Sequence, residues 1–212
     1  MKRYSLIDQL IINADLVLRT VNGISTEKRR EHPATGIPES DLSENEKKMA
    51  ARLMRVNHAG EIAAQGLYHG QTLFARQQTT RRHLLDSAHQ ETEHLYWCEQ
   101  RIKQLGGRTS LLAPVWYAGS FAIGTLASLA GDRWSFAFIR ETEEQVVEHL
   151  QSHLNRLSPK DKITRTIIMQ VISDEAEHAQ SAYSKSSYKL PQELSTMMRA
   201  TAKIMTVGAY YI

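Results

Sequence analysis

Two copies of the motif Glu-x-x-His are the residues in this sequence best suited to metal chemistry. They are Glu91-Thr-Glu-His94 and Glu175-Ala-Glu-His178. A spacing of three residues places the carboxylate and the imidazole on one face of a helix, where both can bind the same ion. One such motif alone is weak evidence, because exposed helices are rich in both residue types.

Apolar residues at spacings of three and four accompany Glu91 and Glu175, and the same holds for Glu61 and Glu143 elsewhere in the chain. Such spacing predicts four helices that each point a glutamate toward the core. Buried carboxylates are costly unless they are paired or bound to metal, and four of them together repel one another. A multivalent cation is therefore the expected partner.

The spacing along the chain predicts that the four glutamates meet. Glu61 and Glu91 lie 91 − 61 = 30 residues apart, and their midpoint, Arg76, falls at the edge of a polar predicted turn. Glu143 and Glu175 lie 175 − 143 = 32 residues apart around a second predicted turn. Residues equidistant from the turn of an antiparallel helical hairpin lie at one height. A glutamate followed by a Glu-x-x-His motif thus occurs twice. The second glutamate follows the first by 82 residues, and the second motif follows the first by 84.

This pattern is the ligand set of ferritin-like di-iron and di-manganese bundles, in which two helices each supply a Glu and two others each supply Glu-x-x-His. The predicted ligands are six residues: Glu61, Glu91, His94, Glu143, Glu175 and His178. Four carboxylates and two imidazoles favour iron or manganese over zinc or copper, whose sites usually take more nitrogen or sulfur ligands. About two iron ions per chain, as Fe2+ or Fe3+, are the expected cofactor.

Helical periodicity with no strand pattern predicts an all-α fold, a ferritin-like four-helix bundle with additional amphipathic helices at both ends. The expected helices cover about residues 4–21, 43–78, 80–105, 132–157 and 161–183, with a last one after Pro191. Ser43 and Glu46 indicate a capping box, and Thr79 or Thr80 is the expected N-cap of the following helix.

Side chains next to the ligands are candidates for supporting them. Asp174 could accept a hydrogen bond from the ring of His94 and fix its tautomer, and Gln90 could do the same for His178. The alternative is that Asp174 and Gln90 are simply exposed. Three more residues are candidates for contact with the ligands or with a substrate: His149, His58 and Tyr68. The other histidines near them are interpreted as surface residues: His83, His89 and His153.

Residues 109–131 carry no charged side chain and no histidine, and they are long enough to cross a bilayer. A single crossing would put the two half-sites on opposite sides of the membrane. We therefore interpret the segment as the crossover between the second and third bundle helices. Two explanations of its apolar character stay open at this point: contact with a membrane surface, or burial against the terminal helices.

Length and composition set broad limits. The 212 residues predict one domain with appendages, here an N-terminal helix and linker over 1–40 and the bundle with its C-terminal helix over 41–212. The net charge of +3 and pI of about 9.0 come from scattered basic residues, so no nucleic-acid partner is expected. Cys98 is the only cysteine, which favours a reducing compartment. The N-terminus lacks the apolar core of a signal peptide, and a cytoplasmic location is expected.

Taken together, the motifs resemble those of the demethoxyubiquinone hydroxylases of ubiquinone biosynthesis, the Coq/Clk hydroxylase family, in its bacterial form. The resemblance rests on Arg55-Val-Asn-His-Ala-Gly-Glu61 with Gly70-Gln71, Gln90-Glu91-Thr-Glu-His94-Leu95, Thr142-Glu143-Glu144 with His149, and Asp174-Glu175-Ala-Glu-His178. It covers nearly the whole chain, including the apolar segment and the tail, whereas residues 1–45 match less distinctively.

The resemblance implies a peripheral membrane monooxygenase on the cytoplasmic side of the cell inner membrane. One atom of O2 would enter C6 of a polyprenyl methoxy-methyl-benzoquinol (demethoxyubiquinol), and the other would leave as water. Electrons would come from NADH or from the quinol itself. The family's ligands fall on the same six residues, with Glu143 rather than Glu144 among them, and His149 matches a histidine near the substrate. Other quinone-synthesis proteins or a second copy of the chain are the further partners that the resemblance suggests.

Two competing interpretations belong to other classes. A ferritin- or rubrerythrin-like ferroxidase or peroxide scavenger would share the ligands but would have no use for an apolar crossover. A membrane-associated scaffold with a vestigial site would not need all six ligands. The sequence contains no nicotinamide-binding fingerprint, and it leaves the prenyl length, the immediate electron donor and the oligomeric state open.

Overall fold

The computed structural model describes residues 30–212, which form helices and contain no strand. The helices of this part of the chain are α2 (Glu44–Thr72), α3 (Gln78–Gln104), α4 (Ala113–Leu129), α5 (Asp132–Arg156), α6 (Lys162–Lys185) and α7 (Gln192–Tyr211). The all-α prediction is confirmed, and so is the C-terminal helix. The helix expected over 4–21 lies outside the described residues, and the division of the chain at residue 40 stays a prediction.

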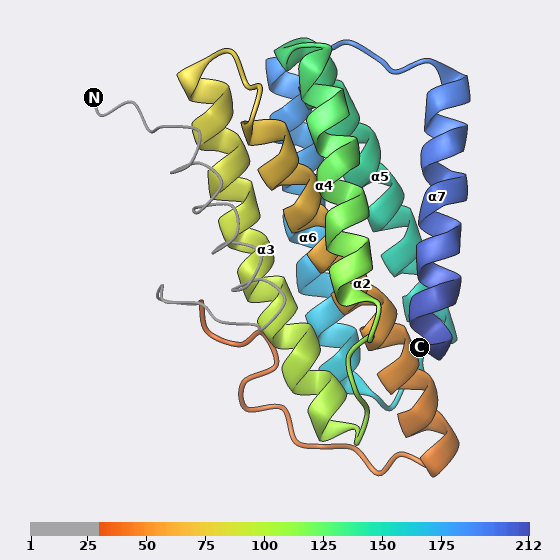
Figure 1. The fold of residues 1–212 in the computed structure, drawn as a ribbon. Helices are drawn as coiled ribbons and strands as arrows, with labels where there is room; N and C mark the ends of the chain where they lie inside the picture. The colour runs from red at the N-terminus through yellow and green to blue at the C-terminus, as the bar shows by residue number, and fades with distance from the viewer. Residues whose placement is uncertain (1–29) are drawn as a thin grey trace.

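Two antiparallel hairpins, α2 with α3 and α5 with α6, make the bundle (Figure 1). The segment expected as a crossover is the helix α4. It carries the chain from the end of the bundle where α3 stops to the opposite end, where α5 begins, and it packs along α2. Helix α7 also lies on α2, so that α2 is covered by three helices at once.

A single carboxylate, Asp132 at the start of α5, sets the turn between α2 and α3. It accepts hydrogen bonds from the backbone amides of Arg76 (2.9 Å) and Gln77 (3.1 Å) and from the hydroxyl of Thr80 (2.9 Å). The helix expected to reach residue 78 therefore ends at Thr72. The expected threonine N-cap is also wrong, because α3 starts after Gln77, which makes no side-chain cap. Both errors arise from a contact distant in sequence.

The other helix ends agree more closely with the sequence. Ser43 and Glu46 form the expected capping box at the start of α2, with both reciprocal hydrogen bonds present. Asp161 caps α6 by accepting from the amide of Thr164 (3.0 Å). These local signals are reliable because they involve groups only three residues apart.

Glycines let α4 approach α2 backbone to backbone. A Cβ atom added at Gly70 would lie 2.2 Å from the carbonyl oxygen of Phe121, and one added at Gly124 would lie 2.2 Å from that of Leu67. No side chain fits between the helices at these points. The close approach fixes α4 against the helix that carries Glu61.

Two of the four hydrophobic clusters in the described residues lie inside the bundle at different heights. One contains residues such as Met54, Trp97 and Ile168, and the other contains residues such as Leu84 and Phe136. Along every bundle helix the predicted ligands fall between the residues of these clusters. The apolar layers above and below thus enclose a polar layer.

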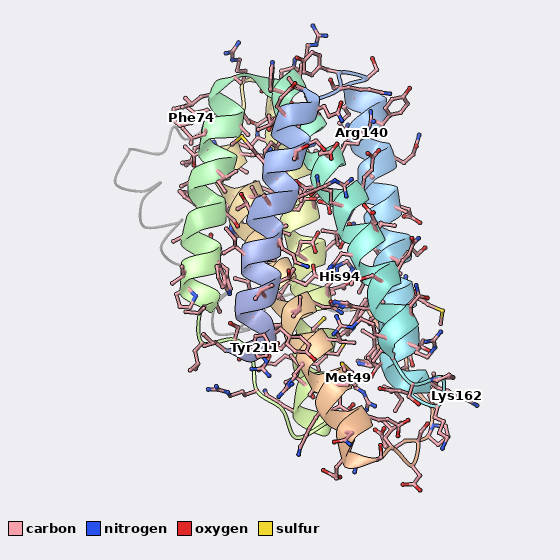
Figure 2. The ribbon with its side chains drawn as sticks, turned by 90° about the vertical axis from the view of Figure 1, so that its right-hand side faces the viewer. Met49, Phe74, His94, Arg140, Lys162 and Tyr211 are labelled. Atoms are coloured by element: carbon pink, nitrogen blue, oxygen red, sulfur yellow. The ribbon has the colours of Figure 1, made fainter. Side chains whose placement is uncertain are left out.

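Helices α4 and α7 lie side by side on one face of the molecule (Figure 2). They meet where the backbone amide of Leu111 donates to the carbonyl of Ile212 (3.2 Å) and where Trp116 packs beside Gly208. Of the fourteen exposed large apolar side chains in the described residues, ten lie on these helices or their ends. Within residues 30–212, no helix has the length and hydropathy needed to span a bilayer. The inner side of α4 packs on α2, and its outer side is exposed.

Candidate metal centre

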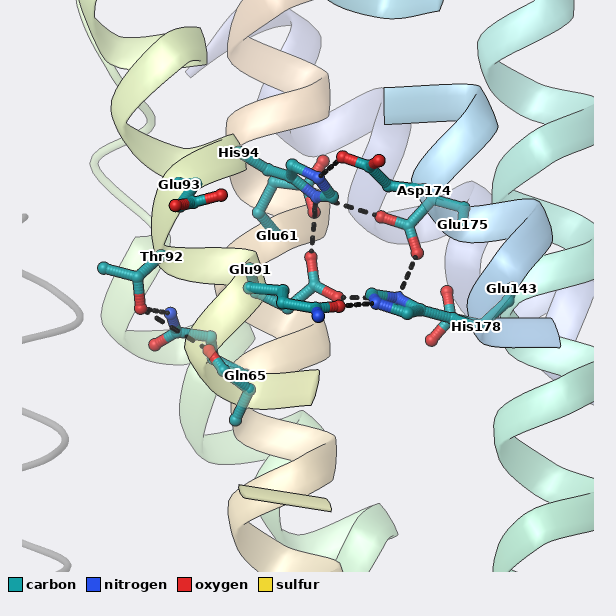
Figure 3. A network of polar contacts seen from close by, with 12 residues as sticks. Glu61, Gln65, Glu91, Thr92, Glu93, His94, Glu143, Asp174, Glu175 and His178 are labelled. Atoms are coloured by element: carbon teal, nitrogen blue, oxygen red, sulfur yellow. Dashed lines mark hydrogen bonds and ion pairs between the residues drawn. The ribbon is translucent and has the colours of Figure 1, made fainter. Parts of the chain in front are cut away.

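All six residues predicted as ligands come together in the polar layer (Figure 3). They form two overlapping groups, one on each side of the centre, whose ligand atoms lie within 4.8 Å of one another. The first group is Glu61, Glu91, His94 and Glu175, and the second is Glu91, Glu143, Glu175 and His178. All six side chains are buried. Four helices have thus placed four carboxylates and two imidazoles in one dry volume.

The two histidines present the same nitrogen to the centre. His94 Nδ1 lies 3.1 Å from Glu91 Oε2 and 3.1 Å from Glu175 Oε1. His178 Nδ1 lies 3.1 Å from Glu175 Oε2 and 3.4 Å from Glu91 Oε1. Each ring therefore has its Nδ1 directed inward, which leaves Nε2 on the outer side of the layer.

The carboxylates divide into two kinds. Glu91 and Glu175 belong to both groups, and each turns one oxygen toward His94 and the other toward His178. Glu61 and Glu143 belong to one group each. If metal ions bind here, Glu91 and Glu175 would be available to both groups, and Glu61 and Glu143 would each be available to one.

The outer nitrogens of both rings have the partners that the sequence suggested. His94 Nε2 lies 2.8 Å from Asp174 Oδ2, and His178 Nε2 is hydrogen-bonded to the side-chain oxygen of Gln90. Because Asp174 as an anion and the oxygen of Gln90 only accept, Nε2 carries the proton in both rings. Once Nδ1 loses its own proton, its lone pair faces the centre, which is the arrangement that metal-binding histidines require.

Two buried oxygens test whether a cation fits this centre. Glu91 Oε1 and Glu175 Oε1 accept no hydrogen bond, although both glutamates are almost fully buried. A buried carboxylate oxygen without a donor is costly. Glu175 Oε1 lies 3.1 Å from His94 Nδ1, and Glu91 Oε1 lies 3.4 Å from His178 Nδ1. A multivalent cation bound between these atoms would satisfy both oxygens.

The pKa values of the ligands reflect the crowding of charge. Burial raises the pKa of Glu61 and Glu143 well above the ordinary value, and repulsion from neighbouring carboxylates adds to it. Burial acts in the same direction on Glu91, yet hydrogen bonds from His178 and His94 hold its pKa below the usual range. Burial also opposes protonation of His178, but bonds to Glu175 and Glu91 raise its pKa to about 11. Protons and metal ions therefore compete for one cluster.

Of the remaining candidates, only Tyr68 reaches a ligand. Its hydroxyl donates to Glu143 from a fully buried position. The ring of His149 meets that of His153 edge-on, with centroids 4.1 Å apart, more than one helical turn from Glu143. His58 is buried, and its Nδ1 lacks a hydrogen bond. The interpretation of His153 as a surface residue is wrong. It is buried on the inner side of α5.

The others interpreted as surface residues, His83 and His89, are half buried. Glu144, the neighbour of Glu143, points outward and is paired with Arg140 at 2.8 Å, whereas Glu143 points into the centre. The spacing argument that preferred Glu143 thus agrees with the geometry.

One group near the centre gave no signal in the sequence. Arg30, in the linker before α2, contacts both Asp174 and Glu93. The linker has no periodicity from which the direction of a side chain could be inferred, and its contacts are with helices 63 and 144 residues further along the chain. Glu93 and Asp174 are acidic residues next to ligands in the sequence, and Arg30 is basic. Their pairing can be recognised only once the structure is known.

The fold and the centre together define a ferritin-like bundle protein with a buried carboxylate- and histidine-rich cluster that is compatible with metal binding. Comparison with known proteins narrows this class. Residues 48–209 match the family described as "Ubiquinone biosynthesis protein COQ7". The chain belongs to this family.

Individual relatives agree along their whole lengths. A protein of Nitrosococcus oceani is 49% identical over 211 residues, covering 100% of this chain and 99% of the relative. Relatives from Chromobacterium violaceum (46%) and Laribacter hongkongensis (47%) each align over 207 residues, 98% of this chain and 100% of their own. All three are named 3-demethoxyubiquinol 3-hydroxylase.

Proposed function

We propose that the protein is a di-iron monooxygenase that hydroxylates a demethoxyubiquinol in ubiquinone biosynthesis. The observation that carries the proposal is the pair of overlapping ligand groups, which share Glu91 and Glu175, in a chain almost half identical to named demethoxyubiquinol hydroxylases. Those names number the hydroxylated ring position 3, and the proposal follows them rather than the C6 numbering used for the expectation from sequence.

The residues of the chain have separable roles in this reaction. Glu61, Glu91, His94, Glu143, Glu175 and His178 would hold the metal ions. Iron bound there supplies the redox chemistry by which one atom of O2 enters the ring and the other leaves as water, with two electrons from a reductant. The apolar clusters on both sides exclude water, which protects a reactive centre from side reactions. Tyr68 holds Glu143 in place by its hydrogen bond.

A direct test is reconstitution with Fe2+ under anaerobic conditions, followed by counting of iron and exposure to O2 with a short-chain demethoxyubiquinol. The expected result is about two irons per chain and one labelled oxygen in the product when 18O2 is used. Parallel reactions with the reduced quinol alone and with the quinone plus NADH distinguish the two electron donors. Ferrous oxidation or peroxide removal without hydroxylation would instead assign the chain to the ferroxidase class.

The face formed by α4 and α7 supports a peripheral position on the cytoplasmic side of the cell inner membrane. Leu126 on α4 and Ile204 on α7 are about two-thirds exposed, at 67% and 69%. Large apolar patches on a soluble surface mark interaction sites, and a polyprenyl substrate is itself dissolved in the bilayer. This face would therefore rest on the lipid surface without crossing it.

Vesicle binding tests the membrane contact. We expect Leu126→Asp with Ile204→Asp to abolish sedimentation with liposomes that contain anionic lipid, because each substitution places a charge in the acyl boundary. The matched control is Met169→Asp, which alters an equally apolar side chain, 51% exposed, on α6. Equal loss of binding in the control, or retained binding in the double variant, would contradict the assignment of this face.

A further inference from the structure

The segment 30–40, here called the strap, is bound to the bundle beside the metal centre. At one end Arg30 contacts α3 and α6, and at the other Glu39 pairs with the buried Arg101 (2.6 Å) while Ser40 donates to the carbonyl of Lys160 (2.6 Å). Ala34 lies between them in the apolar core. The strap precedes residue 48, where the match to the family begins.

Arg30 makes the contacts of the strap that reach the centre. Its guanidinium is bidentate to Asp174, with Nη2 at 2.7 Å from Oδ2 and Nη1 at 3.2 Å from Oδ1. Its backbone amide donates to Glu93 Oε1 at 2.7 Å, and its Nε is paired with the other oxygen of Glu93. It also lies 5.1 Å over the ring of Trp97, and the centroid of that ring is 5.5 Å from the centroid of His94.

These contacts converge on one ligand. Asp174 Oδ2 faces the Nε2 of His94, and the carboxylate is held in that orientation by Arg30 from outside and by Gln170 at 3.0 Å from its own helix. The ring of His94 is held by Asp174 at Nε2 and by Trp97 on its flank. Arg30 touches both of these supports.

The other half of the centre has no such device. The ring of His178 is supported by the neutral amide of Gln90, and within residues 30–212 no arginine or lysine is bonded to Gln90. The two halves repeat each other in their ligands, yet only the His94 half receives an anion backed by a cation. An outer carboxylate raises the basicity of a ligating imidazole more than an amide does.

We propose that Arg30 is a positioning residue for the metal centre, which orients Asp174 and through it His94, so that the ion in the His94 half is bound more tightly than the ion in the His178 half. The inference rests on the proposed metal binding and adds to it an inequality between the two ions. It also gives the strap a role in the centre.

Two effects of Arg30 oppose each other. Its positive charge draws electron density from Asp174 and weakens the support of His94, whereas its bidentate geometry holds the carboxylate at the orientation that His94 needs. The side chain of Arg30 is 46% exposed, so water screens the charge effect. The geometric effect does not depend on screening, and it prevails.

Titration of the full-length, metal-free protein with Co2+, followed by its ligand-field absorption, tests the inference without any turnover. The wild type is expected to bind two equivalents with unequal affinity. Arg30→Ala should weaken the tighter equivalent about tenfold, the lower end of the range for outer partners of metal ligands, and leave the weaker one unchanged. The affinity of Arg30→Lys for the tighter equivalent should lie between those of the wild type and Arg30→Ala. An ammonium cannot contact Asp174 and Glu93 with the geometry of a guanidinium.

A double-variant comparison separates positioning from a general structural effect. In the Asp174→Asn background, Arg30→Ala should change the affinity by less than about twofold, because its route to His94 is already removed. The control Arg199→Ala breaks a similarly exposed ion pair, with Glu148 at 2.5 Å, and should change neither equivalent. Unfolding of each metal-free variant, recorded by circular dichroism, verifies that it is folded.

Three results would overturn the inference: unchanged or increased Co2+ affinity in Arg30→Ala, an equal effect on both equivalents, or a full additional effect in the Asp174→Asn background. A wild-type protein that binds no Co2+ would instead contradict the metal site itself. The failure of the positioning role and the failure of the proposed function are thus distinguishable.

Discussion

Replacing Glu175 with Ala is expected to abolish hydroxylation and to remove both metal ions, not one. Its two oxygens lie 3.1 Å from the Nδ1 atoms of His94 and His178, and it belongs to both ligand groups. Loss of Glu61 should be less severe, because it serves one group only. We expect metal content to fall from about two ions per chain to well below one in Glu175→Ala, and to about one in Glu61→Ala.

Metal analysis after gel filtration, together with the 18O2 assay, measures both effects. The control is Glu177→Ala, which removes an exposed carboxylate two residues from Glu175 on the same helix. The control should retain full metal content and turnover. Wild-type metal content in Glu175→Ala, in protein that circular dichroism shows to be folded, would refute the bridging role.

Gly124→Ala is expected to destabilise the protein strongly, because the glycine lies where α4 and α2 are in backbone contact. The new Cβ would lie 2.2 Å from the carbonyl oxygen of Leu67, which belongs to the backbone of α2 and cannot rotate away. Helix α4 must then move off α2 along its length. Overpacking of this kind costs about 3 kcal/mol, which corresponds to a fall of roughly 10 °C in Tm for a chain of this size.

Gly119→Ala on the same helix provides the matched comparison. Its added Cβ would meet no atom within 4 Å, and the position is exposed. Alanine is the better helix former, so this variant should gain about 0.5–1 kcal/mol. Calorimetric unfolding of the two proteins gives both values. A Gly124→Ala protein as stable as Gly119→Ala would show that α2 and α4 are not in backbone contact.

Much of the centre could be predicted because its residues lie on regular helices, where the spacing along the sequence determines which way a side chain points. Glu61 and Glu143 carry no motif of their own, yet helical spacing gave their direction and distance from the turn gave their height. Asp174 was identified by its place next to Glu175 and its reach across the bundle, and the structure has that bond. Each of these inferences uses only the geometry of a regular helix.

The wrong or missing predictions concern a turn, a linker and a residue type without a clear preference for burial. Asp132 fixes the α2–α3 turn through residues more than 50 positions away, and no local preference of Thr80 reveals that its hydroxyl is already engaged. Arg30 lies in a linker without a period. The interior position of His153 was missed because imidazole tolerates both burial and exposure, so its residue type decides nothing.

The explanation of the apolar segment was left open by the sequence for a physical reason. Both membrane contact and internal burial require the same residue types, so composition does not separate them. The structure shows burial on one side of the helix and exposure on the other: the inner side carries Gly124 against α2, and the outer side carries Leu126. The glycines were the available signal, since small residues at spacings of three to four permit close helix contacts.

The course of α4 from one end of the bundle to the other has a geometric meaning. Helix α2 runs in the opposite direction to α5, as α3 does to α6, so an approximate two-fold axis perpendicular to the bundle relates the two hairpins (Figure 1). This axis exchanges Glu61 with Glu143 and Glu91 with Glu175. One hairpin paired with a copy of itself would complete the same ligand set. Joining two such hairpins in one chain requires a connector that traverses the height of the bundle, and the segment 105–112 together with α4 provides it.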